Sequence, residues 1–467
     1  MYEATRESIS AHQAPDWFRD AKLGIFIHWG LYSIPGWAPT SGPLPEVVAQ
    51  QGWDGWFTRN PYAEWYANSM RIPGSPSAQY HADHYPAGFA YEDFAPRFNA
   101  GVAAWDPAAW ADLFAAAGAR YVVLTTKHHD GFLLWPSAQP NPYRPHYHAA
   151  RDLVGDLTAA VRARGLTMGL YYSGGLDWTF NAHVIRDIAD LFTTIPQQPD
   201  YVAYADTHFR ELIDRYAPAV LWNDIGYPTA ADLYDLFAYY YNQVLEGVIN
   251  DRFSQVPSDA LSDTARELIP GMLPTPMHYD FRTPEYMSYP TIVPEKWEST
   301  RGLGFSFGYN RNETASAMLS ADELIRSFVD IVSKNGNLLL NIGPMADGTI
   351  PSLQRERLVE LGQWLGTNGP AIYGSRPWTQ AEGRTADGIS IRFTQNANSV
   401  YAILLDTPRT PQVVIADLAL ESISAIRLLG QDEDATWRQD DGHLVVTLPA
   451  RPLVGPAHTL RLTMTGA

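Results

Sequence analysis

Acidic and imidazole side chains directly follow apolar runs in this sequence, and these residue types can act as nucleophiles, acids, bases or sugar ligands. Asp224 comes after the apolar run 219–222, and His28 comes after the apolar run 23–27. A carboxylate at the C-terminal end of a buried parallel strand lies where barrel enzymes hold their catalytic groups. An Asp at a strand end is also a common helix cap or turn residue, so this position alone leaves both interpretations open.

The same kinds of side chain recur along the chain. Further candidates are Glu64, His128, His129, Asp130, Arg252, Glu285 and Glu298, together with several Trp and Tyr residues. His128 and His129 are adjacent, and adjacent strand residues point to opposite faces, so at most one of them faces a barrel axis unless the strand has already ended. Neutral imidazoles donate and accept hydrogen bonds, which suits contacts with sugar hydroxyls.

Three functions are compatible with these groups. A retaining glycosidase needs one carboxyl group to attack the anomeric carbon and another to protonate the departing oxygen, and Asp224 with Glu285 or Glu298 could fill these roles. A metal-dependent barrel hydrolase would use the histidines and Asp224 as ligands. Its usual signal is a His-x-His pair on an early strand, whereas the pair here, His146 and His148, lies in a Pro-rich loop where chance explains it better. The third function is a lectin-like barrel that binds sugar without cleaving it.

Alternating strands and helices must position these groups. Predicted strands are 23–27, 121–126, 166–170, 219–222, 247–249 and 337–342. Predicted helices are 107–117, 151–164, 200–216, 230–244, 321–334 and 351–365, with a shorter one at 259–268 capped by Ser258. Residues 38–100 are rich in Gly, Pro, Tyr and Trp, and we expect them to be irregular. Because polar groups collect at strand C-termini, the pattern predicts an α/β fold with a (β/α)8-like barrel over residues 1–370.

The periodicity changes beyond this region. Short alternating runs at 389–393, 400–405, 412–415 and 443–448 are separated by turn residues and include no pattern of helical length. They predict a C-terminal antiparallel β-sandwich over residues 371–467.

Composition narrows the function classes. The 467 residues carry a net charge of −18, which argues against nucleic acid or an anionic membrane as partner. The chain has no Cys, which excludes disulfides and thiolate chemistry. Aromatic residues make up 13%, which suits sugar binding but equally an aromatic-rich core. Residues 1–14 are polar and lack a signal-peptide hydrophobic region, so we expect a cytoplasmic protein, or a secreted one if a leader was removed.

Several motifs occur in an order that resembles one enzyme family. They are Asp-Trp-Phe-x-x-Ala-Lys-x-Gly-Ile-Phe-Ile-His-Trp-Gly at 16–30, Lys-His-His-Asp-Gly-Phe at 127–132, Tyr-Tyr-Ser at 171–173, Leu-Trp-Asn-Asp at 221–224, Asn-Asp-Arg at 250–252, Ser-Phe-Gly-Tyr-Asn at 306–310 and Asn-Leu-Leu-Leu-Asn-Ile-Gly-Pro at 337–344. The series resembles glycoside hydrolase family 29, the α-L-fucosidases, closely over about 15–375 and loosely beyond.

The resemblance implies a retaining exo-glycosidase that uses no metal or other cofactor. Asp224 matches the family's nucleophile, and Glu285, in the family's Asp-Phe-x-Thr-x-Glu-Tyr pattern, matches the acid/base, with Glu298 as the alternative. The positions expected to line the fucose pocket are His28, Glu64, Trp65, His128, His129, Tyr171, Trp222, Arg252 and Phe307. The implied partners are fucosylated glycans or glycosides, and a homo-oligomer is compatible with the sequence. The connection 253–277 is longer than the family pattern leads us to expect.

Overall fold

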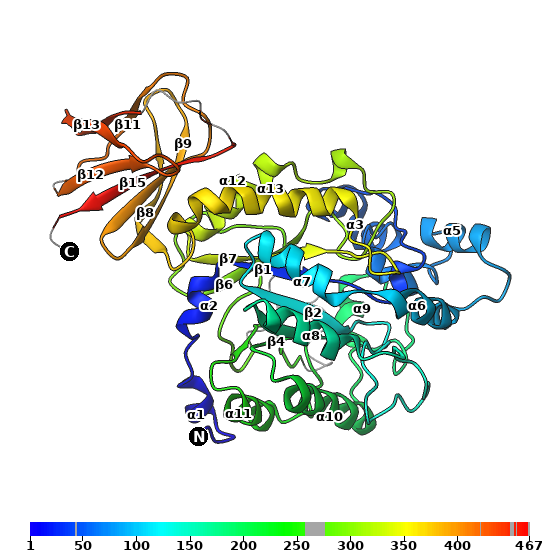
Figure 1. The fold of residues 1–467 in the computed structure, drawn as a ribbon. Helices are drawn as coiled ribbons and strands as arrows, with labels where there is room; N and C mark the ends of the chain where they lie inside the picture. Colours follow the sequence, from blue (N-terminus) through cyan, green and yellow to red (C-terminus); the bar gives the residue numbers. More distant parts are fainter. Residues whose placement is uncertain (43, 257–275, 421, 449–452, 454, 466–467) are drawn as a thin grey trace.

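A parallel sheet dominates the first part of the molecule (Figure 1). The structure is a computed structural model that describes residues 1–42, 44–256, 276–420, 422–448, 453 and 455–465. The strands of this sheet are β1 Leu23–Ile27, β2 Tyr121–Lys127, β3 Thr167–Tyr172, β4 Val220–Asn223, β5 Val248–Ile249, β6 Trp297–Gly302 and β7 Gly336–Ile342. Their spatial order, β5-β4-β3-β2-β1-β7-β6, keeps successive strands adjacent, as the winding of a barrel requires.

Segment 280–286 closes this sheet between its two edge strands. Phe281 pairs in parallel with Asn250, directly after β5, and Glu285 pairs in parallel with Thr300 in β6. The segment therefore takes the eighth place of the barrel without forming a regular strand. The predicted (β/α)8-like barrel is confirmed, with this irregular eighth element.

Strand β6 was not predicted because its sequence is mostly polar. Glu298, Ser299 and Thr300 are buried, although their residue types are usually exposed. Hydrogen bonds compensate for the burial of two of them: Ser299 Oγ donates to the main-chain oxygen of Met287 at 2.8 Å, and Glu298 accepts from Tyr121 and Trp222. A hydrophobic pattern cannot reveal a strand of this kind.

The helices that alternate with the strands agree with the prediction. They are α7 Pro107–Ala116, α8 Leu153–Ala163, α10 Pro199–Tyr216, α11 Leu233–Gln243, α12 Ala321–Ser333 and α13 Ser352–Asn368. Their starts follow from N-caps: the side chains of Asp106, Asp152 and Ser320 each accept a hydrogen bond from a main-chain N–H of the first turn. Gly118 ends the first of these helices at a φ of 84°, which favours glycine. The predicted helix 259–268, with its cap Ser258, lies outside the described residues, as does most of the long connection.

Residues 38–100 are helical in large part, so the prediction of an irregular region was wrong. They contain α3 Leu44–Thr58, α4 Tyr66–Ser69, α5 Pro76–His84 and α6 Ala95–Gly101, with 3-10 turns at Ala63–Trp65 and Tyr91–Phe94. Gly52, at a φ of 68°, interrupts α3, which hides its period in the sequence. The spacing of Trp53, Trp56 and Phe57 is nevertheless helical. Further short helices are α1 Arg6–Ser10, α2 Asp16–Ala21 and α9 Ile188–Thr193.

Aromatic and aliphatic side chains fill the barrel interior. Phe26, Tyr121, Tyr171, Trp222 and Phe281 pack there in one cluster with aliphatic side chains of β2, β4, β5 and β7. Since side chains alternate along a strand, the next inward positions after Phe26 and Trp222 are His28 and Asp224. The packed interior thus supports the polar groups at the C-terminal ends of the strands.

The C-terminal part is an antiparallel β structure, as predicted. Its strands are β8 Arg376–Arg384, β9 Ser390–Asn396, β10 Ser399–Leu404, β11 Gln412–Ile415, β12 Ile423–Leu428, β13 Asp434–Asp440, β14 His443–Thr447 and β15 His458–Met464. Their order is β11-β14-β13-β12-β15-β10-β9-β8. The two edges also meet, because Thr385 bridges to Ile415, so the sheet folds over a single apolar core as a sandwich does.

Helices α12 and α13 lie between the two parts (Figure 1). Trp364 on α13 donates its indole N–H to the main-chain oxygen of Ala457 at 2.9 Å. Arg392 on β9 forms an ion pair with Asp330 on α12 at 2.5 Å. The division of the chain at residues 370 and 371 stays a prediction. In the part of the chain that the structure describes, no helix has the length and apolar character needed to cross a membrane.

Candidate active site

One pocket of about 160 Å³ opens at the C-terminal ends of the barrel strands. It brings together every residue that the sequence predicted for the site: His28, Glu64, Trp65, His128, His129, Tyr171, Trp222, Asp224, Arg252, Glu285 and Phe307. Their individual roles stay predictions at this point. Their arrangement decides what chemistry the pocket can perform.

Asp224 is held by several donors. Its Oδ1 accepts hydrogen bonds from Arg252 Nη1 at 2.9 Å and from the main-chain N–H of Ile225 at 3.0 Å. Its Oδ2 accepts one from the hydroxyl of Tyr171 at 2.9 Å and lies 3.9 Å from His129 Nε2. Burial, followed by the nearby Asp224, raises the pKa of Tyr171 well above its usual value, so this hydroxyl keeps its proton and donates. The carboxylate is fixed and almost fully buried.

A strained turn contributes to this fixation. Ile225 has a φ of 58°, a conformation that costs energy for a β-branched residue. Asn223 holds the turn, because its Nδ2 donates to the main-chain oxygens of Gly226 and Arg252 at 2.9 and 2.8 Å. Asp224 does not cap the following helix, since Asp232 is the N-cap of α11. The turn therefore directs the Ile225 N–H at the Asp224 carboxylate.

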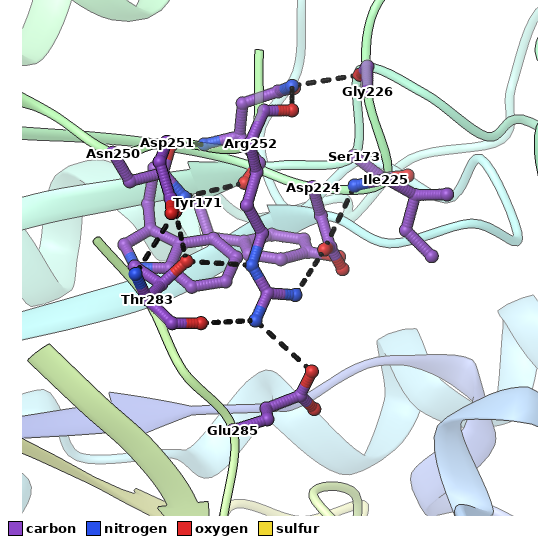
Figure 2. Close-up of polar contacts among 12 residues, drawn as sticks. Tyr171, Ser173, Asp224, Ile225, Gly226, Asn250, Asp251, Arg252, Thr283 and Glu285 are labelled. Carbon is purple, nitrogen blue, oxygen red and sulfur yellow. Dashed lines mark hydrogen bonds and ion pairs between the residues drawn. The ribbon is translucent and has the colours of Figure 1, made fainter. Parts of the chain in front are cut away.

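The guanidinium of Arg252 joins the two proposed catalytic carboxylates (Figure 2). Its Nη1 binds Asp224, and its Nη2 donates to Glu285 Oε2 at 3.1 Å. The remaining donors bind Thr283: Nε reaches Oγ1 at 2.9 Å, and Nη2 reaches the main-chain oxygen at 3.1 Å. The same guanidinium lies 4.7 Å from the ring centroid of Trp222. Two carboxylates bonded to one planar group necessarily lie close together.

Glu285 differs from Asp224 in its exposure. Its side chain is 38% exposed, whereas that of Asp224 is 12% exposed. The protein packed around Glu285 raises its pKa above the usual value, and the negative charge of Asp224 adds to this, while Arg252 acts in the opposite direction. Glu285 thus combines a tendency to hold a proton with access to solvent.

The hydrogen bonds of His28 define its tautomer. Asn341 Nδ2 donates to the main-chain oxygen of Phe307 at 2.6 Å, so Asn341 Oδ1 is left to accept from His28 Nδ1 at 2.7 Å. Burial lowers the pKa of His28 to about 4, so the ring is neutral near pH 7. Its Nε2 is therefore an acceptor suited to a hydroxyl group.

His128 and His129 both reach the pocket because β2 ends at Lys127, before either of them. Their ring centroids are 3.9 Å apart. Ser173 Oγ donates to the main-chain oxygen of Leu176 at 2.9 Å and accepts from His129 Nδ1 at 2.6 Å, which leaves His129 Nε2 as an acceptor. Burial lowers the pKa of His129 to about 3 and that of His128 well below its usual value. Both rings are neutral.

Glu64 and Trp65 come from the 3-10 turn Ala63–Trp65. Glu64 Oε2 accepts a hydrogen bond from the main-chain N–H of Gly308 at 2.7 Å, and burial raises the pKa of Glu64 to about 8. The ring centroid of Trp65 lies 5.2 Å from that of His129, and the ring centroid of Phe307 lies 5.0 Å from that of His28. Polar and apolar groups thus alternate around the pocket.

Two other sequence candidates do not line the pocket. Glu298 is fully buried in the barrel, where it accepts hydrogen bonds from Tyr121 Oη at 2.5 Å and Trp222 Nε1 at 3.1 Å. Burial raises the pKa of Glu298 to about 7. Asp130 accepts a hydrogen bond from Tyr91 Oη at 2.7 Å. Neither carboxyl group is therefore placed to act on a molecule bound in the pocket.

The pocket histidines do not form a metal site with Asp224. Over the described ranges, the only group of three or more His and acidic side chains close enough together to hold a metal ion is His12, His278 and Asp280, and none of these lines the pocket. The arrangement therefore matches a pair of carboxyl groups with neutral polar neighbours better than it matches a metal hydrolase.

Sequence reasoning missed several residues of the site. Thr283 binds Arg252 through two oxygens, and it stands two residues before Glu285 in the same motif. Trp53, Trp56 and Phe57 from α3 also line the pocket. Their helical spacing was the available signal, but it does not show that the helix reaches the barrel mouth.

Comparisons with known proteins agree with this geometry. The family model described as alpha-L-fucosidase matches residues 1–370, and that of the alpha-L-fucosidase C-terminal domain matches residues 386–463. Human tissue alpha-L-fucosidase is 35% identical over 462 residues, which covers 95% of this chain and 87% of that protein. A solved structure of Thermotoga maritima alpha-fucosidase with a mechanism-based inhibitor is 45% identical, with a TM-score of 0.87. A second structure of that enzyme, with fucose, is 44% identical, with a TM-score of 0.86. Each match covers 99% of this chain and 100% of the other chain. The chain belongs to the α-L-fucosidase family of glycoside hydrolases, family 29.

Proposed function

We propose that this protein is a retaining, exo-acting α-L-fucosidase in which Asp224 is the nucleophile and Glu285 is the acid/base. The observation that carries the proposal is the single guanidinium of Arg252, bonded to Asp224 on one side and to Glu285 on the other. Retaining glycosidases need two carboxyl groups about 5–5.5 Å apart. Here both carboxyl groups accept hydrogen bonds from one guanidinium, at 2.9 and 3.1 Å. The solved structures of the Thermotoga maritima α-fucosidase with a mechanism-based inhibitor and with fucose support fucosidase activity for this chain.

The first step forms a covalent intermediate. An Asp224 oxygen attacks the anomeric carbon as the bond to the glycosidic oxygen breaks, and Glu285 transfers its proton to that oxygen. The product is a β-configured fucosyl ester of Asp224 and a free leaving group. The transition state carries positive charge, which the buried Asp224 carboxylate stabilises in a pocket of low polarity.

The second step returns the enzyme to its starting state. Glu285, now ionised, takes a proton from a water molecule while the water oxygen attacks the anomeric carbon. The ester bond breaks, Asp224 regains its charge, and α-L-fucose leaves. The solvent exposure of Glu285 supports this role, because the residue must exchange its proton and admit water in each cycle.

Neutral polar groups are proposed to hold the sugar. His28 Nε2 and His129 Nε2 accept hydrogen bonds from ring hydroxyls, and Glu64 and His128 complete the polar side of the pocket. Trp65, Trp222 and Phe307 offer an apolar wall to the methyl group of fucose. Such a wall disfavours a sugar with a hydroxymethyl group only modestly, by a few kcal/mol at most, on the order of a 10²-fold preference. Fucosylated glycans or glycosides are the proposed substrates.

The anomer formed first in the reaction tests the proposal. We expect proton NMR of the unmodified enzyme acting on an aryl α-L-fucoside to show α-L-fucose before mutarotation. Release of the β anomer would rule out the double displacement. Binding of the fucoside with no turnover would instead favour the lectin-like alternative.

A further inference from the structure

A second cluster of polar side chains lies outside the catalytic pocket, where the N-terminal segment meets the eighth element of the barrel. His12 Nδ1 lies 2.7 Å from Asp280 Oδ1, and His278 Nε2 lies 3.7 Å from the same oxygen. The three ligand atoms are all within 4.8 Å of one another. The side chains are nearly buried, with exposed fractions of 4% for His12, 7% for His278 and 1% for Asp280.

Neighbouring groups already orient the carboxylate. Asp280 Oδ2 accepts hydrogen bonds from the hydroxyl of Tyr241 and from the main-chain N–H of Ile249, each at 2.8 Å. Oδ1 is therefore the oxygen that faces the two imidazoles. The ring of His12 stacks on that of Tyr241 with centroids 3.8 Å apart. Supporting hydrogen bonds of this kind orient the ligands of metal sites in proteins.

We propose that His12, His278 and Asp280 bind a divalent transition-metal ion, with Zn²⁺ as the best-fitting ion. Two imidazoles and one carboxylate make up a three-ligand set that zinc accepts, with a fourth position left for water. Neutral nitrogen and carboxylate donors also suit Co²⁺ and Ni²⁺, whereas Mg²⁺ and Ca²⁺ prefer oxygen ligands alone.

The two contacts of Asp280 with the imidazoles need only small adjustments, and the two imidazole nitrogens start within 4.8 Å of each other. Tetrahedral ligands about 2.0–2.1 Å from zinc stand roughly 3.3–3.4 Å apart. The contact from His12 Nδ1 to Asp280 Oδ1 must open by about half an ångström, and the contact from His278 must close by a few tenths, relative to 2.7 and 3.7 Å. Bound metal would replace the hydrogen bond between His278 Nε2 and the Tyr241 hydroxyl at 2.7 Å. The Tyr241 hydroxyl keeps its bond to Asp280.

The cluster lies between the N-terminal segment and the irregular barrel segment 280–286. His12 follows α1, which packs beside α11 (Figure 1), and Tyr241 lies on α11. Asp280 begins segment 280–286, which carries Glu285 at its other end. Metal would therefore join the N-terminal segment to the barrel element that holds the proposed acid/base. Because the three ligands are nearly buried, we expect slow metal uptake that requires the N-terminal segment to move.

Binding of Co²⁺ and Zn²⁺ to the full-length, chelator-treated protein tests the proposal. We expect one equivalent of Co²⁺ to give the intense visible absorption of a tetrahedral site, one equivalent of Zn²⁺ to displace it, and Zn²⁺ to raise the Tm by a few degrees. The variants His12→Gln and His278→Gln remove a ligand but keep a polar side chain, and each should weaken binding by more than about tenfold. His183→Gln is the matched control, because His183 is 60% exposed and lies outside the cluster; its binding should equal that of the unmodified protein.

Crystals of the unmodified protein soaked in Zn²⁺ provide a test that depends on no variant. An anomalous difference peak between the three side chains would support the site. A peak found only elsewhere, no binding in solution, or equal binding by His12→Gln, His278→Gln and His183→Gln would overturn it. None of these measurements uses a fucoside, so their outcome is independent of the proposed catalytic function.

Discussion

The two proposed catalytic carboxyl groups stand on two very different parts of the barrel. Asp224 directly follows the regular strand β4 and is held by Arg252, Tyr171 and the N–H of Ile225. Glu285 stands on the irregular segment 280–286, and its side-chain hydrogen bond is to Arg252. The side chain of Asp224 is 12% exposed and that of Glu285 is 38% exposed.

This difference matches the two kinds of work that double displacement demands. A nucleophile attacks one carbon from one direction, so a fixed and buried carboxylate serves it best. An acid/base exchanges a proton with solvent in every cycle, which requires access and some freedom of movement. Regular and irregular elements of one barrel therefore hold groups with opposite requirements, and Arg252 couples them.

Removal of the fixed carboxylate should have the largest effect. Asp224→Gly should reduce kcat by about 10³-fold or more, because the proposed nucleophile that forms the ester is lost. Azide should restore turnover of an activated aryl fucoside and give β-fucosyl azide, since the small anion fits the space of the lost side chain. The product is identified by NMR. Unchanged activity together with no azide product would place the nucleophile elsewhere.

Removal of the exposed carboxyl group should have an effect that depends on the leaving group. Glu285→Ala should reduce kcat/KM by roughly 10²–10⁴-fold for fucosides with poor leaving groups, because these need the proton. The loss should be far smaller for activated aryl fucosides, whose leaving groups depart as anions. Kinetics on a series of aryl fucosides measure the difference. Equal losses across the series would assign the proton transfer to another residue.

Arg252 is the group that couples the two regions, and its removal should alter the pH profile. A charge-assisted hydrogen bond contributes about 1.5–3 kcal/mol, so Arg252→Gln should lose roughly 10- to 100-fold in kcat/KM. Glu285 must be protonated to act as an acid, so activity falls as the pH rises above its pKa. Arg252 lowers the pKa of Glu285, so its replacement should move this basic limb to higher pH.

Arg252→Lys is the matched control for this change. It keeps the positive charge but cannot bind both carboxylates with a planar fork, so it should lose activity with a smaller shift of the basic limb. A basic limb that stays in place in Arg252→Gln would show that Glu285 is not the group that titrates.

The sequence predicted the regular region well and the irregular region poorly, for a physical reason. Apolar runs such as 219–222 reveal strands buried on both sides, and each such run directs the polar residues after it, including Asp224, to one end of the barrel. Segment 280–286 and β6 are built from polar residues paired by hydrogen bonds, which no hydrophobic period reveals. Glu285 therefore depended on a motif, and the contact of Thr283 with Arg252 was not foreseen.

The contribution of α3 to the pocket lining was missed for a related reason. Gly52 breaks the helical period, and its Trp and Phe side chains contact groups far away in the sequence. The sequence did not decide whether one or both of His128 and His129 reach the pocket, because this depends on where β2 ends. Both features depend on contacts between residues far apart in the sequence, whereas the strands can be predicted from local patterns.

Glu298→Gln should have the smallest effect on turnover and sharpens the contrast with Glu285. Glu298 touches Trp222 from inside the barrel and does not line the pocket, so we expect a loss of only a few-fold, equal for good and poor leaving groups. A loss that grows as the leaving group becomes poorer would make Glu298 the proton donor. The same aryl fucoside series used for Glu285→Ala provides the comparison.

The stability of Glu298→Gln separates charge from hydrogen bonding. Burial raises the folded-state pKa of Glu298 to about 7, above its value near 4.5 in the unfolded chain, so the folded protein holds the extra proton between these limits. The stability contribution of the protonated group is complete below about pH 4.5 and is lost as the pH rises through about 7. Relative to the unmodified protein, Glu298→Gln should therefore become more stable over this range, by up to about 3 kcal/mol. Denaturant unfolding at several pH values measures the difference in free energy of unfolding between the variant and the unmodified protein. A part of this difference that does not change with pH reports the altered hydrogen bond to Tyr121. A stability difference that stays constant with pH would mean that Glu298 is ionised throughout, held as a carboxylate by Tyr121 and Trp222.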